Sequence, residues 1–317
     1  MSASNNLKPI FKGLLTWVPG VQRAFYDRNA GGATASAAYC YGVWLKHLSL
    51  LYRSGMRSIP QSILELGPGE SLGTGLAALL SGAERYAAVD AVRHASVTTT
   101  RPVLRELTAM FKERAPRPVK GWPDYDAELD GRLFPSAILP DEDLAITLKP
   151  SRVAQIGAAV ERLDAERQHP MVRYATWGEP EPMGPGEADL IFSHVVMSVV
   201  DNVERIYAHC ARWLRRGGWM SHQIDLTSLG VTEEWNGHLR YSDAAWAAVA
   251  GRRPLFVNRE RASAHVRLLE KNGFEVITVL RKIATGGITR DELAPRWRDI
   301  SDEDLNCSTA FIVARKP

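Results

Sequence analysis

The sequence contains few cysteines, and their spacing excludes two classes of small scaffold. Cys40, Cys210 and Cys307 lie far apart along 317 residues. An odd number of cysteines without paired spacing argues against a disulfide framework or a zinc ribbon and suits a reducing compartment. The chain also lacks an HExxH segment or a clustered set of carboxylates. We therefore expect a cytoplasmic protein without a metal site.

Long apolar runs are also missing. The apolar stretch of residues 7–18 is short and is interrupted by Lys8, Pro9 and Lys12, which does not fit a secretion signal. No stretch reaches the roughly 18 apolar residues that a membrane-spanning helix needs. We expect no membrane span.

The chain has no strong charge of either sign. Its 39 basic and 36 acidic residues give a net charge of +3, and no long basic run is present. Charge alone therefore gives no reason to expect a nucleic-acid partner. With 45% hydrophobic and 24% charged residues, the composition is that of an ordinary globular protein with a sizeable core.

A glycine-rich segment lacks the spacing of two common nucleotide-binding loops. Its glycines are Gly67, Gly69, Gly73 and Gly75, so Leu72 stands where the dinucleotide pattern G-x-G-x-x-G requires its third glycine. No G-K-[ST] follows, which excludes a phosphate loop of the Walker type. The segment still predicts a turn at which a ligand approaches the backbone closely.

Strands and helices alternate along the chain, which predicts an α/β fold. Residues 62–66 and 85–92 are expected to form parallel strands that flank a helix marked by Leu76, Leu79 and Leu80. Further strands are expected at 171–176, 188–193, 219–226, 274–280 and 309–314. A helix with an apolar face should begin at Val203 and end near Arg215 and Arg216, before Gly217 and Gly218.

The sequence pattern also predicts how the chain divides into segments. Residues 1–60 are expected to form a helical cap, whose helix has Tyr41, Trp44, Leu45, Leu48 and Leu51 on one face. Residues 61–317 should form the main domain. Prolines punctuate residues 93–170, which we interpret as an insertion of short helices. Residues 227–261 form an aromatic-rich segment that we interpret as a substrate loop.

Two acidic residues beside the glycine turn indicate the charge of the ligand. Asp90 ends the second strand about 20 residues after the turn, where a carboxylate can accept hydrogen bonds from ribose hydroxyls. Glu65 precedes the turn. This acid suits a ligand with positive charge, such as the sulfonium and amino group of S-adenosylmethionine, better than a pyrophosphate.

Three segments in order resemble the motifs of class I S-adenosylmethionine-dependent methyltransferases. Ile63-Leu-Glu-Leu-Gly-Pro-Gly69 with Asp90 is similar to the first two motifs, and residues 188–193 are similar to the motif of the fourth strand. Residues 213–218 resemble the turn before the fifth strand, with Arg216 in place of the usual proline. The resemblance covers about residues 60–94 and 170–317.

The resemblance implies a doubly wound, Rossmann-like sheet of seven strands with an antiparallel last strand. It also implies S-adenosyl-L-methionine as the cofactor. The cofactor-binding residues expected on this basis are Glu65, Gly67, Gly69, Asp90 and Ser193.

A closer similarity is to a group of largely uncharacterised bacterial methyltransferases. Ser221-His-Gln-Ile-Asp-Leu226 and Trp235-Asn-Gly-His-Leu-Arg-Tyr-Ser-Asp243 match segments that this group carries. The chain departs from many class I enzymes after the fourth strand, where Ser198 and Val199 replace a Glu-His pair.

Two histidines are candidates for a general base, because methylation of a hydroxyl is helped by removal of its proton. His194 follows the fourth strand and His222 lies late in the fifth, and ligands of open α/β sheets bind beyond the carboxyl ends of the strands. Asp225 could orient the His222 imidazole only if that strand ends before Asp225. His47 is expected to be structural.

Four residues of the aromatic-rich segment suit a sugar-like acceptor: Trp235, Asn236, His238 and Tyr241. A lid folded by its own aromatic residues is the alternative interpretation. The function expected is O-methylation of a carbohydrate or similar polar metabolite. The alternatives are methylation of a small natural product or an amine, and a catalytically silent binding subunit.

Overall fold

The computed structural model describes residues 3–18, 33–118, 125, 127–129, 131–165, 169–179, 181–253 and 255–317. Seven strands form one sheet with the order β3-β2-β1-β4-β5-β7-β6. Their bounds are β1 Ser62–Leu66, β2 Arg85–Asp90, β3 Val172–Thr176, β4 Ala188–His194, β5 Leu214–Asp225, β6 Glu275–Ile283 and β7 Cys307–Arg315. All seven lie where the sequence predicts a strand.

The strand directions complete the fold class. β1 runs parallel to β2 and to β4, and β2 runs parallel to β3. β7 runs antiparallel to β5, because Gly217 N donates to Lys316 O (2.7 Å) and Leu226 N donates to Ser308 O (2.9 Å). The residue numbers of the partners on β7 decrease as the residue numbers on β5 increase, so the two strands run in opposite directions. The prediction of a doubly wound α/β sheet with an antiparallel last strand is therefore confirmed.

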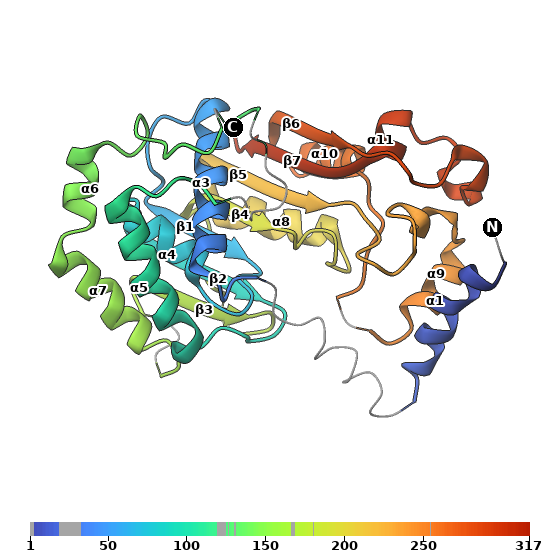
Figure 1. Cartoon of the computed structure of the whole chain (residues 1–317), viewed down its shortest axis with the longest axis horizontal. Coiled ribbons are helices and arrows are strands. Elements are labelled where there is room, and N and C mark those ends of the chain that lie inside the picture. Colours follow the sequence, from blue (N-terminus) through green and yellow to red (C-terminus); the bar gives the residue numbers. More distant parts are fainter. Residues whose placement is uncertain are drawn as a thin grey trace. The chain divides into compact units, whose positions relative to one another are not determined.

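The helices connect these strands (Figure 1). Their bounds are α1 Ala3–Leu15, α3 Ala37–Arg53, α4 Gly73–Leu80, α5 Val97–Glu113, α6 Asp141–Thr147, α7 Pro150–Glu161, α8 Val203–Trp213, α9 Asp243–Ala250, α10 Ala262–Lys271 and α11 Asp302–Asn306. Three short 3-10 helices are η1 Gly237–Arg240, η2 Arg290–Glu292 and η3 Pro295–Trp297. None of the helices in the described part of the chain is long and apolar enough to cross a bilayer.

The chain folds into two compact units. Unit 1 contains the described residues within Met1–Ala30, Val195–His209 and His222–Ile312. Unit 2 contains those within Gly31–His194, Cys210–Ser221 and Val313–Pro317. The expected cap of residues 1–60 is divided by this partition, since α1 belongs to unit 1 and α3 belongs to unit 2.

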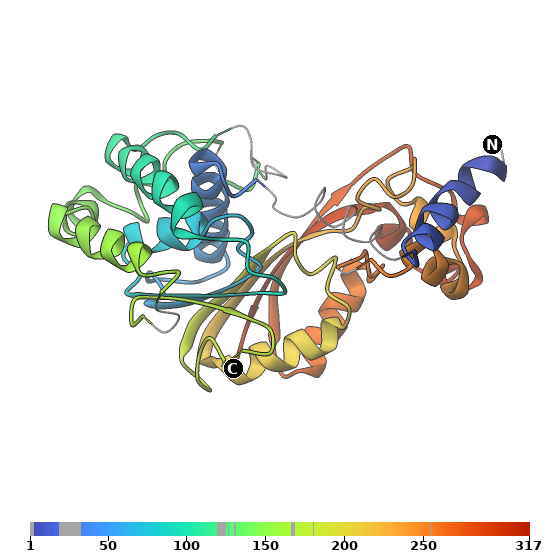
Figure 2. The ribbon, with the colours of Figure 1, turned by 90° about the horizontal axis from the view of Figure 1, so that it is seen from below.

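In unit 2, α3, α4 and α5 lie against one face of β1, β2 and β3 (Figure 2). The apolar face predicted for α3 is buried, and its five residues are 0% exposed: Tyr41, Trp44, Leu45, Leu48 and Leu51. Trp44 Nε1 donates to Ser81 Oγ at 2.8 Å, which ties α3 to the end of α4. Helix α3 is therefore part of the core that carries the carboxyl edge of the sheet.

Helix α5 shows that the segment 93–170 is more regular at its start than its prolines indicate. It runs for 17 residues and begins with a capping box, in which the Ser96 and Thr99 side chains each bond to the other's backbone N–H. It ends at Glu113, before Pro116 and Pro118. The first part of the expected insertion is thus a long helix between β2 and β3, and the short helices α6 and α7 come after it.

The structure corrects the predicted end of the helix before β5. The sequence pattern places Arg215 and Arg216 at the end of a helix, but α8 ends at Trp213 and both arginines lie in β5. Lys316 Nζ donates to Ala211 O (2.6 Å) and to Leu214 O (2.8 Å), so a distant lysine binds carbonyl groups where the helix ends. Contacts from Lys316, the residue after β7, therefore help to set this boundary, and they leave no signal in the local sequence.

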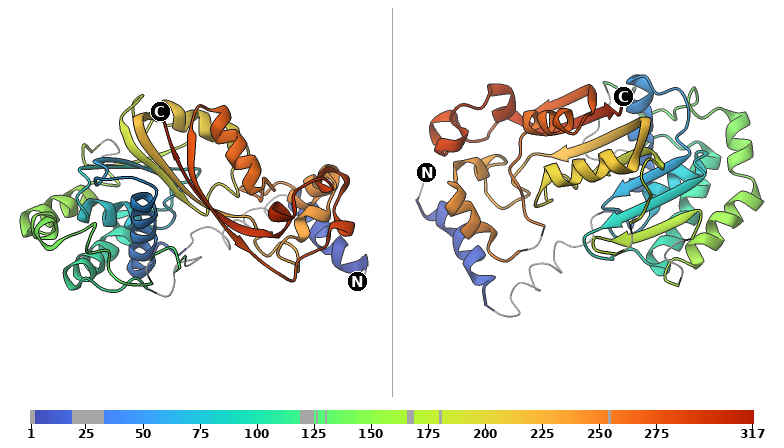
Figure 3. Two further views of the ribbon diagram at one scale, coloured as in Figure 1. Left: turned by 90° about the horizontal axis from the view of Figure 1, so that it is seen from above. Right: turned by 180° about the vertical axis from the view of Figure 1, so that it is seen from behind.

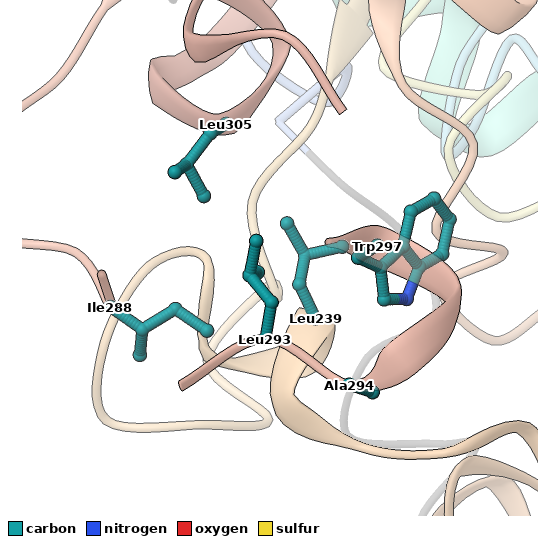
Figure 4. Close-up of a cluster of buried hydrophobic side chains, with 6 residues drawn as sticks. All are labelled: Leu239, Ile288, Leu293, Ala294, Trp297 and Leu305. Atoms are coloured by element: carbon teal, nitrogen blue, oxygen red, sulfur yellow. The ribbon is translucent and has the colours of Figure 1, made fainter. Parts of the chain in front are cut away.

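Unit 1 contains its own apolar clusters. Helix α1 packs along α9 (Figure 1), and α10 packs on β6 (Figure 3). Six buried side chains, one from η1 and the others from the segment between β6 and β7, form a cluster (Figure 4): Leu239, Ile288, Leu293, Ala294, Trp297 and Leu305. This cluster holds the aromatic-rich segment to the end of the chain.

Candidate active site

The turn after β1 has the backbone geometry that the glycine pattern predicts. Gly67 and Gly69 have φ angles of 67° and 76°, in the left-handed region that side chains disfavour. Gly67 N donates to Val89 O at 2.8 Å, which continues the pairing of β1 with β2 into the turn. The turn therefore presents bare backbone at the carboxyl end of β1.

The strand register brings three candidate residues to one edge. Leu66, the last residue of β1, pairs with Val89 on one side and with Ser193 on the other. The residues that follow these three are Gly67, Asp90 and His194. The carboxyl ends of β2, β1 and β4 thus place an acid, a glycine turn and an imidazole in neighbouring positions. Ser193 lies one row deeper and is fully buried.

Asp90 faces the glycine turn. Its Oδ1 accepts from Ala91 N (2.7 Å), and its Oδ2 accepts a longer bond from Gly69 N (3.4 Å). Burial raises the pKa of the Asp90 carboxyl, and the two N–H groups lower it. The side chain remains partly exposed. A partly exposed carboxylate beside the turn can accept hydrogen bonds from vicinal ribose hydroxyls.

Glu65 lies beneath the turn and not at its surface. It is 2% exposed, and Tyr86 Oη donates to its Oε2 at 2.6 Å. The Thr74 hydroxyl and the Gly75 N–H, in the first turn of α4, lower the pKa of this carboxyl. Burial raises the pKa of Glu65 to about 8, and the nearby Asp90 charge adds to the rise. Glu65 therefore anchors α4 behind the glycine turn.

The close packing of Tyr86 on α4 gives a stability prediction. A Cβ on Gly75 would lie 2.0 Å from Tyr86 ring atoms, so Gly75→Ala must displace the ring that holds Glu65. We expect this variant to lose about 1–3 kcal/mol of unfolding free energy, measured by urea denaturation.

Gly157→Ala in α7 is the matched control. Its Cβ would meet only Leu104 Cδ2, at 3.9 Å, and alanine favours the helix over glycine. We expect this variant to gain about 0.5–1 kcal/mol. Equal effects of the two substitutions would contradict the close approach at Gly75.

His194 is the last residue of β4 and contacts helix α3. His194 Nδ1 lies 3.3 Å from His47 Nε2, and the Tyr39 ring meets the His194 ring edge-on at 5.8 Å between centroids. Val195, the next residue, has a φ of 62°. A β-branched residue in the left-handed region is strained, and such strain is typical of functional sites.

His47 and Ser221 contact each other, which the sequence pattern does not indicate. His47 is 0% exposed, and its Nδ1 lies 2.7 Å from Ser221 Oγ on β5. On α3, His47 is surrounded in sequence by core residues, so its spacing indicates packing alone. Ser221 precedes His222, which the sequence favoured as the base, and side chains alternate between faces along a strand. Ser221 and His222 therefore face opposite sides of the sheet, and it is Ser221 that faces His47.

His222 lies in a closed aromatic cluster of unit 1. Its ring centroid is 5.7 Å from that of Tyr207, and Tyr207 Oη lies 2.9 Å from His265 Nδ1. Both histidines are 0% exposed. Burial lowers the pKa of each to about 3. An imidazole with this pKa, closed to solvent, is poorly suited to take a proton from an acceptor near neutral pH, which argues against His222 as the base.

Asp225 does not orient His222. Strand β5 continues through Asp225, so residues 222 and 225 face opposite sides of the sheet. The Asp225 Oδ1 accepts from Thr227 N at 2.8 Å. Burial raises the pKa of this carboxyl, and the N–H of Thr227 and the charge of Arg261 lower it. These contacts give Asp225 a role in the turn that ends β5.

The four residues of the aromatic-rich segment differ in exposure. Asn236 is 0% exposed, and its side chain bonds to Ile288 N (2.6 Å), Ile288 O and Leu305 O (both 3.3 Å). Those bonds occupy the amide, so we do not keep Asn236 as a substrate ligand. Trp235 is partly exposed, and its Nε1 donates to Thr285 O at 3.2 Å.

His238 and Tyr241 are also buried. His238 is 1% exposed, and burial together with the Arg261 and Arg259 charges lowers its pKa well below the usual value. Tyr241 is 5% exposed, and its carbonyl accepts from the Arg259 guanidinium at 2.7 Å. The pattern agrees with a segment folded by its own aromatic residues, and Trp235 is the member of the four that remains open to a ligand.

Comparisons with known proteins do not assign an activity to this chain. No family model and no curated protein matches the chain. Among solved structures, phosphoethanolamine N-methyltransferase 2 from Haemonchus contortus in complex with S-adenosyl-L-methionine is 13% identical, with a TM-score of 0.45; the alignment covers 93% of this chain and 60% of that chain.

Two further structures are similar at the same level. An S-adenosylmethionine-dependent methyltransferase from Mesorhizobium loti is 12% identical, with a TM-score of 0.41, over 84% of this chain and 96% of that one. Geranyl diphosphate C-methyltransferase from Streptomyces coelicolor A3(2) is 11% identical, with a TM-score of 0.42, over 84% and 77% of the two chains. At these values the assignment of function depends on the residues of the site.

Proposed function

We propose that this protein is an S-adenosylmethionine-dependent methyltransferase that uses the carboxyl edge of β1, β2 and β4. The observation that carries the proposal is the register of Leu66, which sets Gly67, Asp90 and His194 side by side. Ligands of open α/β sheets bind at this edge. The strand order agrees with the proposal, because the sheet has the antiparallel last strand that the sequence resemblance implies.

The residues at the edge suit this cofactor in backbone conformation and in charge. The left-handed Gly67 and Gly69 leave the backbone open for close approach, and Asp90 supplies acceptors for ribose hydroxyls. Asp90, a partly exposed acid beside the turn, suits a cation, whereas Glu65 is buried beneath the turn. The bound cofactor would supply an electrophilic methyl group on a sulfonium.

The protein's contribution to the reaction is positioning and proton removal. Holding an acceptor in line with the methyl group accounts for a large part of the rate in displacements of this kind. His194 lies beside the turn and would take the proton of an acceptor hydroxyl, while the oxygen–carbon bond forms and the sulfur–carbon bond breaks. The imidazolium of His194 would hold this proton until it is released after the reaction.

The acceptor is proposed to be a hydroxyl of a carbohydrate or similar polar metabolite, with an amine or a small natural product as the alternative. Trp235 is the candidate contact, since partly exposed indole faces stack on sugar rings. The similarity of residues 221–226 and 235–243 to an uncharacterised bacterial group remains a prediction. A screen of oligosaccharides, sugar nucleotides and amines for methyl incorporation tests the acceptor class.

Cofactor binding gives a direct test. Asp90→Ala should weaken S-adenosylmethionine binding by about 1–3 kcal/mol, or about 5- to 150-fold, because the ribose hydroxyls lose a charged acceptor. Isothermal titration calorimetry measures this loss. Glu106→Ala, which removes an exposed acid of α5, is the control and should bind as the unmodified protein does.

NAD is the comparison ligand for the same titration. The glycine spacing predicts no saturable NAD binding. Unchanged S-adenosylmethionine affinity in folded Asp90→Ala would remove Asp90 from the site. Tight NAD binding together with absent S-adenosylmethionine binding would overturn the proposed function.

A further inference from the structure

Helix α1 and the turn after it expose a row of large apolar side chains, which we call the apolar row. Its six members lie within residues 7–18 and are between 38% and 65% exposed: Leu7, Phe11, Leu14, Leu15, Trp17 and Val18. Leu7, Phe11 and Leu14 share a face of the helix because they are spaced by four and three residues. The other exposed large apolar side chains in the described part of the chain are scattered between residues 92 and 283. Such a concentration on one surface marks a site of interaction.

Another face of α1 is fixed to α9 within unit 1 (Figure 1). The two helices approach closely at Gly13, because a Cβ there would lie 2.0 Å from Ala248 O. Thr16 Oγ1 donates to Gly13 O (2.5 Å) and accepts from Arg252 N (2.8 Å), which ties the end of α1 to the segment after α9. The contact with α9 therefore uses a different face from the apolar row and leaves the row uncovered.

The charges around the apolar row are positive. Lys8 and Lys12 are exposed and lie beside the row on α1, which contains no acidic residue. Arg252 is also exposed, and its guanidinium lies 4.3 Å from the centroid of the Trp17 ring. The single acid of α9, Asp243, is already ion-paired with two arginines. The surface thus combines apolar side chains with cations whose charge no neighbouring acid on α1 or α9 offsets.

This combination favours the surface of an anionic bilayer as the occupant. A helix that lies in a membrane interface places its apolar face at the boundary of headgroups and acyl chains and its lysines against the headgroups. An indole is enriched at the same boundary, because it is apolar with one polar N–H. A second copy of the chain fits less well. A symmetric dimer through this face would bring Lys8, Lys12 and Arg252 close to their own copies, and like charges repel.

We propose that α1 and the turn up to Val18 bind the surface of a membrane that contains anionic lipids. The helix lies in the plane of the interface, since 13 residues are too few to span the core of a bilayer. The apolar row enters the boundary of headgroups and acyl chains, and Lys8, Lys12 and Arg252 contact lipid phosphates. This binding is independent of the methyltransferase activity proposed for the carboxyl edge of the sheet.

The test measures how the full chain partitions onto lipid vesicles in a flotation assay. Vesicles of phosphatidylcholine alone are compared with vesicles of phosphatidylcholine and phosphatidylglycerol. We expect binding to the anionic vesicles that weakens as salt is raised, and weaker binding to the neutral ones.

Two double variants separate the apolar and the charged contributions. Phe11→Ser with Leu14→Ser should weaken binding about 20- to 400-fold, because two largely exposed apolar side chains no longer leave water. Lys8→Gln with Lys12→Gln should weaken binding to the anionic vesicles about 10- to 30-fold and leave binding to the neutral vesicles nearly unchanged.

Leu133→Ser with Ile146→Ser is the matched control. These side chains are 76% and 59% exposed and lie in unit 2. The control should bind vesicles as the unmodified protein does. Because every substituted side chain is exposed, urea denaturation should show little change in the stability of any of the three variants.

Three results would overturn the proposal. The first is absent binding of the unmodified protein to the anionic vesicles. The second is unchanged binding in the variant that carries Phe11→Ser and Leu14→Ser. The third is a dimer in solution, measured by light scattering, that this variant converts to a monomer; that result would assign the apolar row to a second copy of the chain.

Discussion

His194→Gln is expected to lower turnover about 10²–10⁴-fold, the usual contribution of a general base. S-adenosylmethionine affinity should change little, because the glycine turn and Asp90 lie on other strands. The assay measures S-adenosylhomocysteine release with the acceptor found by screening, and calorimetry measures the affinity.

His222→Phe is the matched variant for this prediction. Its ring stays in the aromatic cluster with Tyr207, and the structure gives the His222 imidazole no access to an acceptor. Turnover near pH 8 should therefore be retained. A large loss in His222→Phe together with near-full activity in His194→Gln would return the role of base to His222. Full activity in both variants would mean that positioning alone carries catalysis.

Acid should destabilise the protein steeply through its buried histidines. The folded-state pKa values of His222 and His265 are about 3, while an unfolded histidine titrates near 6.5. Between these values the unfolded chain binds protons that the folded protein does not. Stability is therefore complete above about pH 6.5 and is lost as pH falls, by about 1.4 kcal/mol per pH unit for each such histidine.

His222→Phe isolates one of these contributions. The variant should lose this dependence, which rises from about 0.7 kcal/mol per pH unit at pH 6.5 to about 1.4 kcal/mol per pH unit near pH 5, measured by urea denaturation across a pH series. The comparison is made as a difference between protein and variant, because the buried Glu65 acts in the opposite direction. At pH 8 the two differ by packing alone. Parallel pH profiles of the two proteins would show that His222 is protonated in the folded state.

The fold could be predicted from patterns within short stretches of the sequence, whereas the arrangement of the candidate site depends on contacts between distant segments. The glycine turn and Asp90 could be predicted because the turn and the end of the second strand are separated by a short helix. The start of β5 could not, because Lys316 at the far end of the chain binds one carbonyl near the end of α8 and the carbonyl of Leu214, the first residue of β5. The length of α5 could not be predicted from the number of prolines in residues 93–170, because most of these prolines come after the helix has ended.

The choice of histidine shows the same limit. Sequence places His194 and His222 after neighbouring strands, but it does not say which side of the sheet a side chain faces. A shift of one residue along β5 separates Ser221, which contacts His47, from His222, which lies with Tyr207. Tertiary packing alone distinguishes the two, and it also brings the buried His47 into contact with both Ser221 and His194.

The protonation of Glu65 links the stability of the folded protein to pH. The carboxyl keeps its proton up to about pH 8 in the folded protein, whereas in the unfolded chain it ionises near 4.5. The free protein therefore loses stability as pH rises through this window. A cation bound at the glycine turn favours the ionised form and displaces the proton. Binding of a cation at the turn would therefore release one proton from Glu65, so the net charge of this buried region would change little.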